Sequence, residues 1–368
     1  MADSRETVLE IDLRALEHNY RFLRSKINPN TKFLAVVKAY AYGSETIAIA
    51  KKLEALGVDY FAVAYTREGA VLRDHGIMTP ILVLHPQTVN FPQLIARCLE
   101  PSIYSERILR AFQDAAIAAG QTGYPVHLKF NTGLNRLGFR DSDIESVVHQ
   151  LQQSDSLKAI SLFSHLAASD DLSEKAFTQD QINRFRSIAQ ELSGKLENKP
   201  FLHLLNTSGI LNYPEAQFDM VRSGIGLYGY SNNPEVDTQL KPVATLKTVI
   251  SQIHHIEPGE SVGYNRAFTA SGKCTIATLP LGHADGIGRI YGNTRGIVKV
   301  SGHDAPIVGN VCMDMLMIDI SGISCKEGDE VVLFGKGHSA EEVAAGAMTI
   351  SYELLTGISQ RVPRKILS

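Results

Sequence analysis

The chain has 368 residues, of which 44% are hydrophobic and 20% are charged, and its formal net charge is −3. This composition predicts a globular protein with one large and one smaller domain, and it excludes a basic face for nucleic acid. No apolar run approaches the roughly 20 residues that cross a bilayer, so we expect no membrane association. Four widely spaced cysteines and a start without a secretion signal favour a cytoplasmic protein with reduced thiols.

Short apolar runs alternate with helix-period segments between about residues 31 and 230. The expected strands are 33–37, 60–64, 81–84, 101–105, 126–130, 159–165, 201–206 and 219–227, and the clearest helices are 45–56, 105–120 and 177–192. Eight strand-and-helix units predict an α/β fold with a closed (β/α)8 TIM barrel. An open doubly wound sheet is the alternative.

After residue 236 the pattern changes to alternating runs separated by Gly, Pro, Asn and Asp, which is typical of an antiparallel β domain. The runs cover 243–256, 274–282, 295–302, 305–320 and 329–335, and one helix is expected near 341–348. We therefore expect a barrel over 10–237 and a mainly antiparallel β domain over 1–9 and 238–368. The opening run, 6–13, is a strand that either covers the barrel or joins the C-terminal sheet.

Polar residues follow the ends of six predicted barrel strands. They are Lys38, His85, Lys129 with Asn131, His165, Asn206 and Arg222. Barrel active sites lie where the carboxyl ends of the strands meet, so these side chains are candidates for one site. Each of them alone is more often a solvated loop residue.

Lys38 and the glycine-rich run after Arg222 indicate a cofactor when they are taken together. A lysine at the end of an apolar strand is either a surface residue or a desolvated amine that forms a Schiff base with an aldehyde. The run VRSGIGLYG (221–229) offers backbone N–H groups that suit a phosphate. An aldehyde and a phosphate together point to pyridoxal 5'-phosphate.

Seven blocks, in order along the whole chain, resemble the alanine racemases, which are pyridoxal-phosphate enzymes with an N-terminal barrel and a C-terminal β domain. The blocks are AVVKAYAYG (35–43), HLKFNTGLNRLGF (127–139), VRSGIGLYG (221–229), SVGYNRAF (261–268), LGHADGIGR (281–289), GNVCMDMLMID (309–319) and SYELLTGISQRVPR (351–364). The resemblance implies an isomerase that interconverts L- and D-alanine on the external aldimine of the cofactor and supplies D-alanine for peptidoglycan. A racemase of broader specificity, for example one that accepts serine, is the alternative.

The resemblance also implies roles for single residues. Lys38 binds the cofactor covalently and handles a proton on one face of the substrate, and Tyr264 from the partner subunit serves the other face, because inversion at carbon requires two bases. His165, tied to Arg222, supports this tyrosine. Arg222 faces the pyridine nitrogen and keeps its own proton, which favours racemisation over transamination. The enzyme is then a homodimer with shared active sites.

The remaining residues implied by the resemblance hold the cofactor or the substrate. The cofactor-binding set is completed by Tyr42, Asn206, Ser208, Gly224, Ile225 and Tyr352. Arg136 lies beside the substrate carboxylate, and Lys129 is carbamylated so that it orients this arginine. Met313 and Asp314 come from the partner's β domain, His283 and Arg289 lie at the entrance, and no metal is expected. Ser208 as a plain helix N-cap and Lys129 as a solvent-facing lysine are the alternative interpretations.

Two positions depart from the family pattern. The family has asparagine where this chain has Tyr40, and tyrosine where it has His283. A histidine at the entrance titrates near neutrality and so bears on the pH profile and the pocket width.

Two other classes of protein remain as alternatives. One is a pyridoxal-phosphate decarboxylase of basic amino acids, which places a carboxylate opposite the ring nitrogen, so Arg222 argues against it. The other is a single-barrel cofactor carrier without a C-terminal β domain, and residues 240–368 argue against that.

Overall fold

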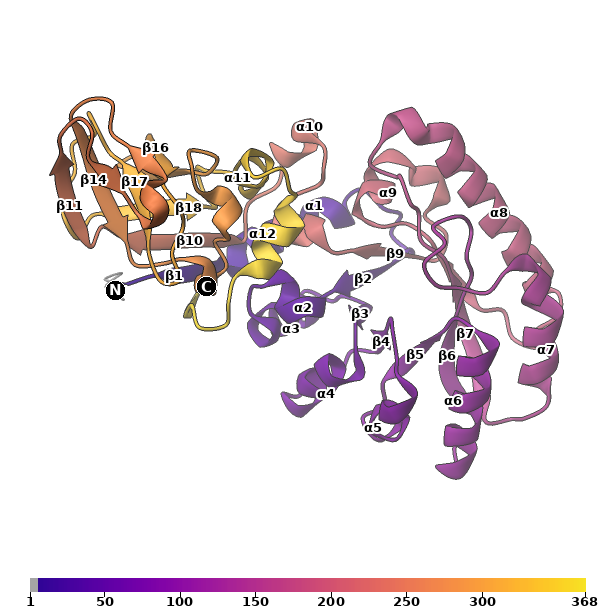
Figure 1. Cartoon of the computed structure of the whole chain (residues 1–368). Coiled ribbons are helices and arrows are strands. Elements are labelled where there is room, and N and C mark those ends of the chain that lie inside the picture. Colours follow the sequence, from indigo (N-terminus) through magenta and orange to yellow (C-terminus); the bar gives the residue numbers. More distant parts are fainter. Residues whose placement is uncertain (1–5) are drawn as a thin grey trace.

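Eight parallel strands close into a barrel in this computed structural model, which describes residues 6–368 (Figure 1). The spatial order of the strands follows the sequence, and β9 pairs with β2 to close the ring. The strands are β2 (Lys32–Val36), β3 (Tyr60–Val63), β4 (Ile81–Val83), β5 (Glu100–Ile103), β6 (Tyr124–Lys129), β7 (Leu157–Phe163), β8 (Phe201–His203) and β9 (Met220–Ser223). The predicted TIM barrel is therefore confirmed, and the open sheet is excluded.

One helix precedes the first barrel strand, the others follow barrel strands, and together they form an outer layer (Figure 1). They are α1 (Leu13–Arg24), α3 (Thr46–Ala55), α4 (Thr66–Asp74), α5 (Phe91–Ala96), α6 (Glu106–Ala118), α7 (Ile144–Gln152), α8 (Lys175–Ser193) and α9 (Thr207–Asn212). Their apolar residues recur at helical spacing; α6, for example, buries Ile108, Leu109, Phe112 and Ala116. The helices predicted over 45–56, 105–120 and 177–192 are all present.

The C-terminal part of the chain folds into a mainly antiparallel sheet in the order β11-β14-β17-β16-β15-β18-β10-β1-β19. Its strands are β1 (Val8–Asp12), β10 (Ala244–Val249), β11 (Gln252–Ile256), β14 (Cys274–Leu279), β15 (Ile297–Val300), β16 (His303–Val308), β17 (Leu316–Asp319), β18 (Glu330–Phe334) and β19 (Arg364–Leu367). The short strands β12 (Ser261–Val262) and β13 (Phe268–Thr269) pair separately, and α10 (Pro234–Asp237), α11 (Ala340–Gly346) and α12 (Ser351–Gly357) complete the chain.

The first described strand belongs to this sheet and does not cover the barrel. β1 pairs antiparallel with β10, where Leu9 faces Leu246, and parallel with β19, where Leu9 faces Arg364. Residues 1–5 of the segment expected to join the β domain lie outside the described residues. The chain therefore starts in one unit, continues through the barrel and returns to the same sheet.

Some predicted runs contain turns that the apolar pattern did not reveal. The run 219–227 is a strand only as far as Ser223, because the chain then enters the 3-10 turn η5 (Ile225–Tyr228). The run 305–320 forms β16 and β17 with a loop between them, which starts at Gly309 with a φ of 65°. Both interruptions matter, because the turns carry candidate site residues.

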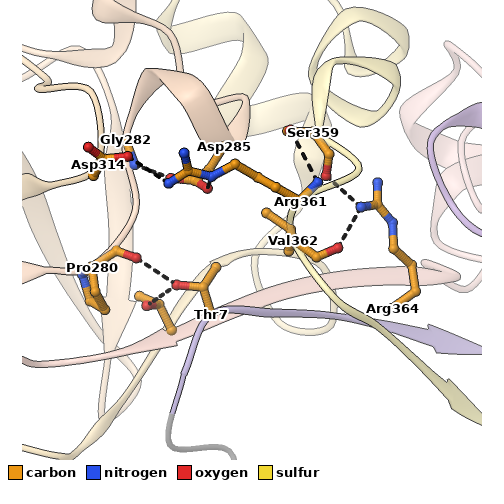
Figure 2. Close-up of polar contacts among 10 residues, drawn as sticks. Thr7, Pro280, Gly282, Asp285, Asp314, Ser359, Arg361, Val362 and Arg364 are labelled. Carbon is orange, nitrogen blue, oxygen red and sulfur yellow. Dashed lines mark hydrogen bonds and ion pairs between the residues drawn. The ribbon is translucent and has the colours of Figure 1, made fainter.

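Arg364 on β19 joins the β domain to the mouth of the barrel. Its guanidinium donates hydrogen bonds of 2.5 to 3.2 Å to the carbonyl oxygens of Gly43, Ser44, Ile358, Ser359 and Val362. Figure 2 shows its contacts with Ser359 and Val362. Gly43 has a φ of 78°, and a Cβ there would lie 2.0 Å from the carbonyl oxygen of Leu355 in α12. The two units therefore meet by close backbone contact at this point.

We expect Arg364→Met to lower the free energy of unfolding by about 3 kcal/mol, because several carbonyl oxygens lose a charged donor. Urea titration of the purified protein measures this change. The matched control is Arg21→Met, which removes an exposed i,i+4 ion pair with Glu17 and should cost less than about 0.5 kcal/mol. Equal costs for the two variants would show that Arg364 does not stabilise the junction.

Candidate active site

A cavity of about 640 Å³ opens at the carboxyl ends of the barrel strands. Among the residues that line it are most of the predicted site residues, namely Lys38, Tyr42, Lys129, Arg136, His165, Asn206, Ser208, Arg222, Gly224, Ile225 and Tyr352. His85, at the end of β4, also lines the cavity. The six strand ends therefore converge as the sequence predicted. Apolar side chains complete the wall, among them Val36, Leu84, Leu137 and Phe163.

The segment that carries Lys38 is a left-handed helical turn. Residues 39–42, in α2 (Lys38–Tyr42), have φ values of 52 to 55°, and Gly43 follows at 78°. Each L-residue in this conformation costs roughly 1–2 kcal/mol, so surrounding contacts must hold the turn. Glu68 supplies such contacts, because its carboxylate accepts hydrogen bonds from the backbone N–H groups of Ala39, Ala64 and Tyr65.

Lys38 lies two residues beyond the end of β2 and faces the cavity. Burial lowers the pKa of its amine, the positive charge of Arg136 lowers it further, and the carboxylate of Glu68 opposes this shift. The environment therefore favours the neutral amine, which is the nucleophilic form.

Tyr42 ends the left-handed turn against the glycine-rich segment after β9. Its hydroxyl occupies the space beside Gly224, where a Cβ would lie 2.1 Å from the oxygen, so this position requires glycine. The Tyr42 ring stacks on Tyr228 with a centroid distance of 4.5 Å, and Tyr352 from α12 lies 6.0 Å away. Burial raises the pKa of Tyr352 to about 12, so its hydroxyl is a donor at neutral pH. The phenol of Tyr42 and the backbone of Gly224 therefore form one end of the cavity.

Asn206, and not Ser208, is the N-cap of α9. Its Oδ1 accepts hydrogen bonds from the N–H of Gly209 and from the hydroxyl of Ser169. Ser208 lies within the first turn and is buried beside the cavity, with its hydroxyl 3.4 Å from the carbonyl oxygen of Ser231. The N-cap interpretation of Ser208 was therefore wrong.

Arg222 is a buried cation at the base of the cavity, with a side chain only 5% exposed. Its Nη1 and Nη2 donate hydrogen bonds of 2.7 to 3.2 Å to three backbone carbonyl oxygens and to the Nδ1 atoms of His165 and His203. Burial, and then the charge of Arg136, lowers the pKa of Arg222 to about 9, so it stays charged at neutral pH. Burial, and then Arg222, lowers the pKa of His165 well below its usual value, so this ring is neutral.

The neutral state and the bond to Arg222 fix the tautomer of His165. Arg222 only donates, so Nδ1 of His165 accepts, and the single ring proton lies on Nε2. That N–H is a donor for an oxygen atom that enters the cavity.

Lys129 and Arg136 also line the cavity. Lys129 is 6% exposed, and burial together with Arg136, Arg222 and Lys38 lowers its pKa to about 7. Its Nζ lies 5.5 Å from the ring centroid of Phe163, and so does the guanidinium carbon of Arg222. Asn131 has a different function from the one its strand-end position suggested, because its Oδ1 accepts from the N–H groups of Gly133 and Asn135 and so shapes the loop that carries Arg136.

Apart from Tyr352, the candidate residues of the β domain do not line this cavity in the same chain. Tyr264 is 70% exposed and Met313 is 59% exposed, and His283 and Arg289 are also exposed. Their loops contact each other: Asn310 donates to the carbonyl oxygen of Tyr264, and the N–H of His283 donates to that of Cys312.

Asp314 is fixed by an ion pair. Arg361 bridges it to Asp285, with N–O distances of 2.7 Å to both carboxylates (Figure 2). Asp285 in turn accepts from the N–H of Gly282, where a Cβ would lie 2.3 Å from the carbonyl oxygen of Cys312. The loop that carries Met313 and Asp314 is therefore held on the segment of His283.

Several residues around the site were not predicted from the sequence. His203 and Phe163 contact Arg222 from β8 and β7, Glu68 holds the turn of Lys38, and Tyr65 lines the cavity. His203 and Phe163 occupy inward positions of predicted strands, so strand alternation was the signal that could have found them. Within residues 6–368, no helix is long and apolar enough to cross a membrane, and no group of three His, Cys, Asp or Glu side chains is arranged to hold a metal.

The fold and the site define the class of protein: a barrel with lysines and a buried arginine in the cavity at its mouth, joined to a mainly antiparallel β domain. Comparison with known proteins identifies the family. Residues 11–232 match the family "Alanine racemase, N-terminal domain", and residues 243–366 match "Alanine racemase, C-terminal domain". The chain therefore belongs to the alanine racemase family, whose members are pyridoxal-phosphate-dependent isomerases.

Full-length relatives and solved structures agree with this assignment. The alanine racemase of Treponema denticola is 36% identical, with 98% of each chain covered, and that of Geobacter sulfurreducens is 37% identical, with 100% of this chain and 98% of the relative covered. The structure of alanine racemase from Streptomyces coelicolor has a TM-score of 0.94 at 32% identity, with both chains fully covered. The structure from Bacillus anthracis with bound L-Ala-P has a TM-score of 0.92 at 30% identity, covering 99% of this chain and 95% of that one. The single-barrel carrier and the decarboxylase of basic amino acids are therefore set aside.

We expect Tyr40→Gly to be more stable than Tyr40→Ala by about 1 kcal/mol, because glycine adopts the left-handed conformation without a Cβ penalty. Tyr40 is 62% exposed, so both variants lose little packing. Urea titration compares the two proteins directly.

The control lies on an ordinary right-handed helix. Ala48→Gly in α3 should be destabilised by up to about 1 kcal/mol. If glycine were less stable than alanine at position 40, as it is expected to be at position 48, the left-handed turn would not be under strain.

Proposed function

We propose that this chain racemises alanine with two proton-handling side chains, Lys38 of one subunit and Tyr264 of the other, in a homodimer that shares its active sites. The observation that carries the proposal is the separation of these groups. Lys38 is half-buried and lines the barrel cavity, whereas Tyr264 is 70% exposed on the β domain of the same chain, where a second copy can use it. Inversion at carbon needs one group to remove a proton and another to deliver one from the opposite face.

We propose pyridoxal 5'-phosphate as the cofactor, and the residues present fit it. The hydroxyls of Tyr42, Ser208 and Tyr352 and the backbone N–H groups of Gly224 and Ile225 offer donors to a dianionic phosphate. Gly224 keeps this end open where any side chain would collide with Tyr42. Lys38 supplies the amine that binds the aldehyde, and Asn206 lines the same cavity. When bound, this cofactor supplies an electron-withdrawing ring that makes the α-proton of the substrate acidic.

Arg222 and His165 determine, in this proposal, which atoms of the site carry a proton. Arg222 donates hydrogen bonds without giving up a proton, so the ring nitrogen that it faces stays unprotonated, which favours racemisation over transamination. His165 presents its Nε2–H to the cavity. We propose that this N–H binds the oxygen of the partner's Tyr264 and stabilises the phenolate, which a free tyrosine with a pKa near 10 would rarely form at neutral pH.

Arg136 is proposed to bind the substrate carboxylate, and Lys129 to orient it as a carbamate. A neutral amine attacks carbon dioxide, an N–C bond forms, and one proton leaves for solvent. The lowered pKa of Lys129, about 7, supports this step. The product is an anion, which turns repulsion between Lys129 and Arg136 into attraction.

The β domain is proposed to complete the site of the partner. The division is a cofactor-binding barrel over 10–237 and a β domain over 1–9 and 238–368 that supplies Tyr264, Met313 and Asp314, with His283 and Arg289 at the entrance. Cytoplasmic supply of D-alanine for peptidoglycan is the proposed role, and the four free cysteines agree with a reducing compartment. Activity on serine is the alternative that His283 at the entrance keeps open.

We expect Lys38→Ala and Tyr264→Ala to be inactive separately but to recover about a quarter of wild-type activity when unfolded together and refolded as mixed dimers. Half of the dimers then contain both variants, and one of their two sites is intact. Circular dichroism of alanine solutions measures the recovery.

The matched control mixes Lys38→Ala with Arg136→Ala, two changes in the same barrel. Every mixed dimer then has two damaged sites, so no activity should return. No recovery in the Lys38 and Tyr264 mixture, with dimers present, would mean that each chain uses its own tyrosine or none.

We expect the enzyme to show a carbamate carbon in its ¹³C NMR spectrum after equilibration with ¹³C-bicarbonate, and Lys129→Gln to lack it. The reason is the neutral amine that the lowered pKa of Lys129 provides. Lys195→Gln, at a partly exposed lysine that follows α8 and pairs with Glu145 and Glu191, is the control and should leave the signal unchanged. A spectrum without the carbamate signal would exclude the modification under these conditions.

A further inference from the structure

We propose that Glu100, His127, Ser161 and His203 form a hydrogen-bonded relay inside the barrel that fixes the proton positions next to Arg222. Glu100, His127 and Ser161 are then positioning residues for the reaction, since they act on Arg222 through His203. This inference deepens the proposed function, because it rests on the role of Arg222 beside the cofactor ring.

The relay crosses five neighbouring strands, from β5 to β9, one residue on each. Glu100 Oε2 lies 2.7 Å from His127 Nε2, and His127 Nδ1 lies 2.6 Å from Ser161 Oγ. Ser161 Oγ lies 3.1 Å from His203 Nε2, and His203 Nδ1 lies 2.9 Å from Arg222 Nη1. An unbroken row of contacts therefore connects a carboxylate to the active-site guanidinium.

The middle of the relay is completely shielded from solvent. His127, Ser161 and His203 have no exposed surface, whereas the Glu100 side chain retains 13%. Phe163 stacks on His203 with a centroid distance of 4.7 Å and an angle of 11° between the rings, which holds that ring in place. A buried polar atom without a hydrogen-bond partner destabilises the folded protein. The hydrogen bonds of these residues therefore affect the stability of the barrel core.

When each imidazole carries one proton, one arrangement of protons satisfies every contact. Guanidinium only donates, so His203 accepts at Nδ1 and carries its proton on Nε2, which donates to Ser161. The Ser161 hydroxyl then donates to Nδ1 of His127. A carboxylate only accepts, so His127 donates from Nε2 to Glu100. Arg222 at one end donates and Glu100 at the other end accepts, so both ends require hydrogen bonds that run from Arg222 toward Glu100.

The direction matters because its reversal would place two donors against each other. If Glu100 did not accept from His127, this ring could carry its proton on Nδ1 and donate to Ser161. The Ser161 hydroxyl would then be free to donate to Nε2 of His203, and that tautomer of His203 carries its proton on Nδ1, facing Arg222 Nη1. The bond at 2.9 Å would be lost. The carboxylate of Glu100 therefore favours, from across the barrel, the tautomer of His203 that accepts from Arg222.

The first test is ¹⁵N NMR of the holoenzyme labelled at histidine, with signals assigned by His127→Asn and His203→Asn. We expect both rings to be neutral with the proton on Nε2. A proton on Nδ1 of either ring, or a doubly protonated ring, would overturn the relay. This readout does not depend on Lys38 or Tyr264, so failure of the mixed-dimer experiment refutes the shared site and leaves the relay standing.

The second test is kinetic. Ser161→Ala removes the central link with little change in volume, and we expect kcat to fall about tenfold, the size of one lost hydrogen bond, with KM for alanine within about twofold. Glu100→Gln retains an oxygen that accepts from His127 and should keep kcat within about threefold of wild type. Wild-type kcat in Ser161→Ala, or an equal loss in Glu100→Gln, would contradict the relay.

The matched control is Tyr60→Phe. The Tyr60 ring lies 5.8 Å from the His127 ring and its hydroxyl bonds to Glu100, but it stands outside the row of contacts. This variant should keep kcat within about twofold even if its thermal midpoint falls as far as that of Ser161→Ala. A loss of kcat that follows the thermal midpoint in all variants would show a merely structural role.

Discussion

The site depends on the repulsion between four cationic groups that share one cavity. Lys38, Lys129, Arg136 and Arg222 line the same space, and each lysine has its pKa lowered first by burial and then by Arg136. The repulsion lowers the pKa of the lysines more readily than it removes a proton from the arginines, because a guanidinium holds its proton much more strongly than an amine. The cavity therefore combines two lysines whose pKa is lowered with two arginines that keep their charge.

The strained turn of Lys38 shows how the barrel holds this arrangement. A left-handed turn of four non-glycine residues does not persist by itself, and its cost of several kcal/mol must come from contacts elsewhere. Glu68 binds the start of the turn, Arg364 binds its end, and α12 packs on Gly43. The turn places both Lys38 and Tyr42 in the lining of one cavity. The β domain of the same chain is therefore part of the support for the barrel site, and not only a donor to a second subunit.

The sequence predicted the barrel and most of its cavity because parallel strands buried on both faces form continuous apolar runs, and because their carboxyl ends converge by topology. It missed the turn at 39–42, since nothing in AYAY departs from a right-handed helix. It also missed the polar interior. Glu100, His127, Ser161 and His203 stand on four different strands, separated by between 27 and 42 residues in sequence from one contact to the next. Their one shared signal is an inward position, which apolar neighbours share as well.

The exposed residues of the β domain follow from the chemistry of inversion. In the proposed mechanism Lys38, which lines the cavity at the barrel mouth, serves one face of the substrate. A group for the opposite face must come from outside the barrel, and it must be rigid enough to deliver a proton within hydrogen-bond reach. Tyr264 is exposed, yet its backbone is held by Asn310, while Arg361 fixes the neighbouring loop through Asp285 and Asp314. A flexible surface tyrosine would need no such supports. Their presence on an exposed face, away from the cavity of the same chain, is what argues for a second subunit as the place where this tyrosine works.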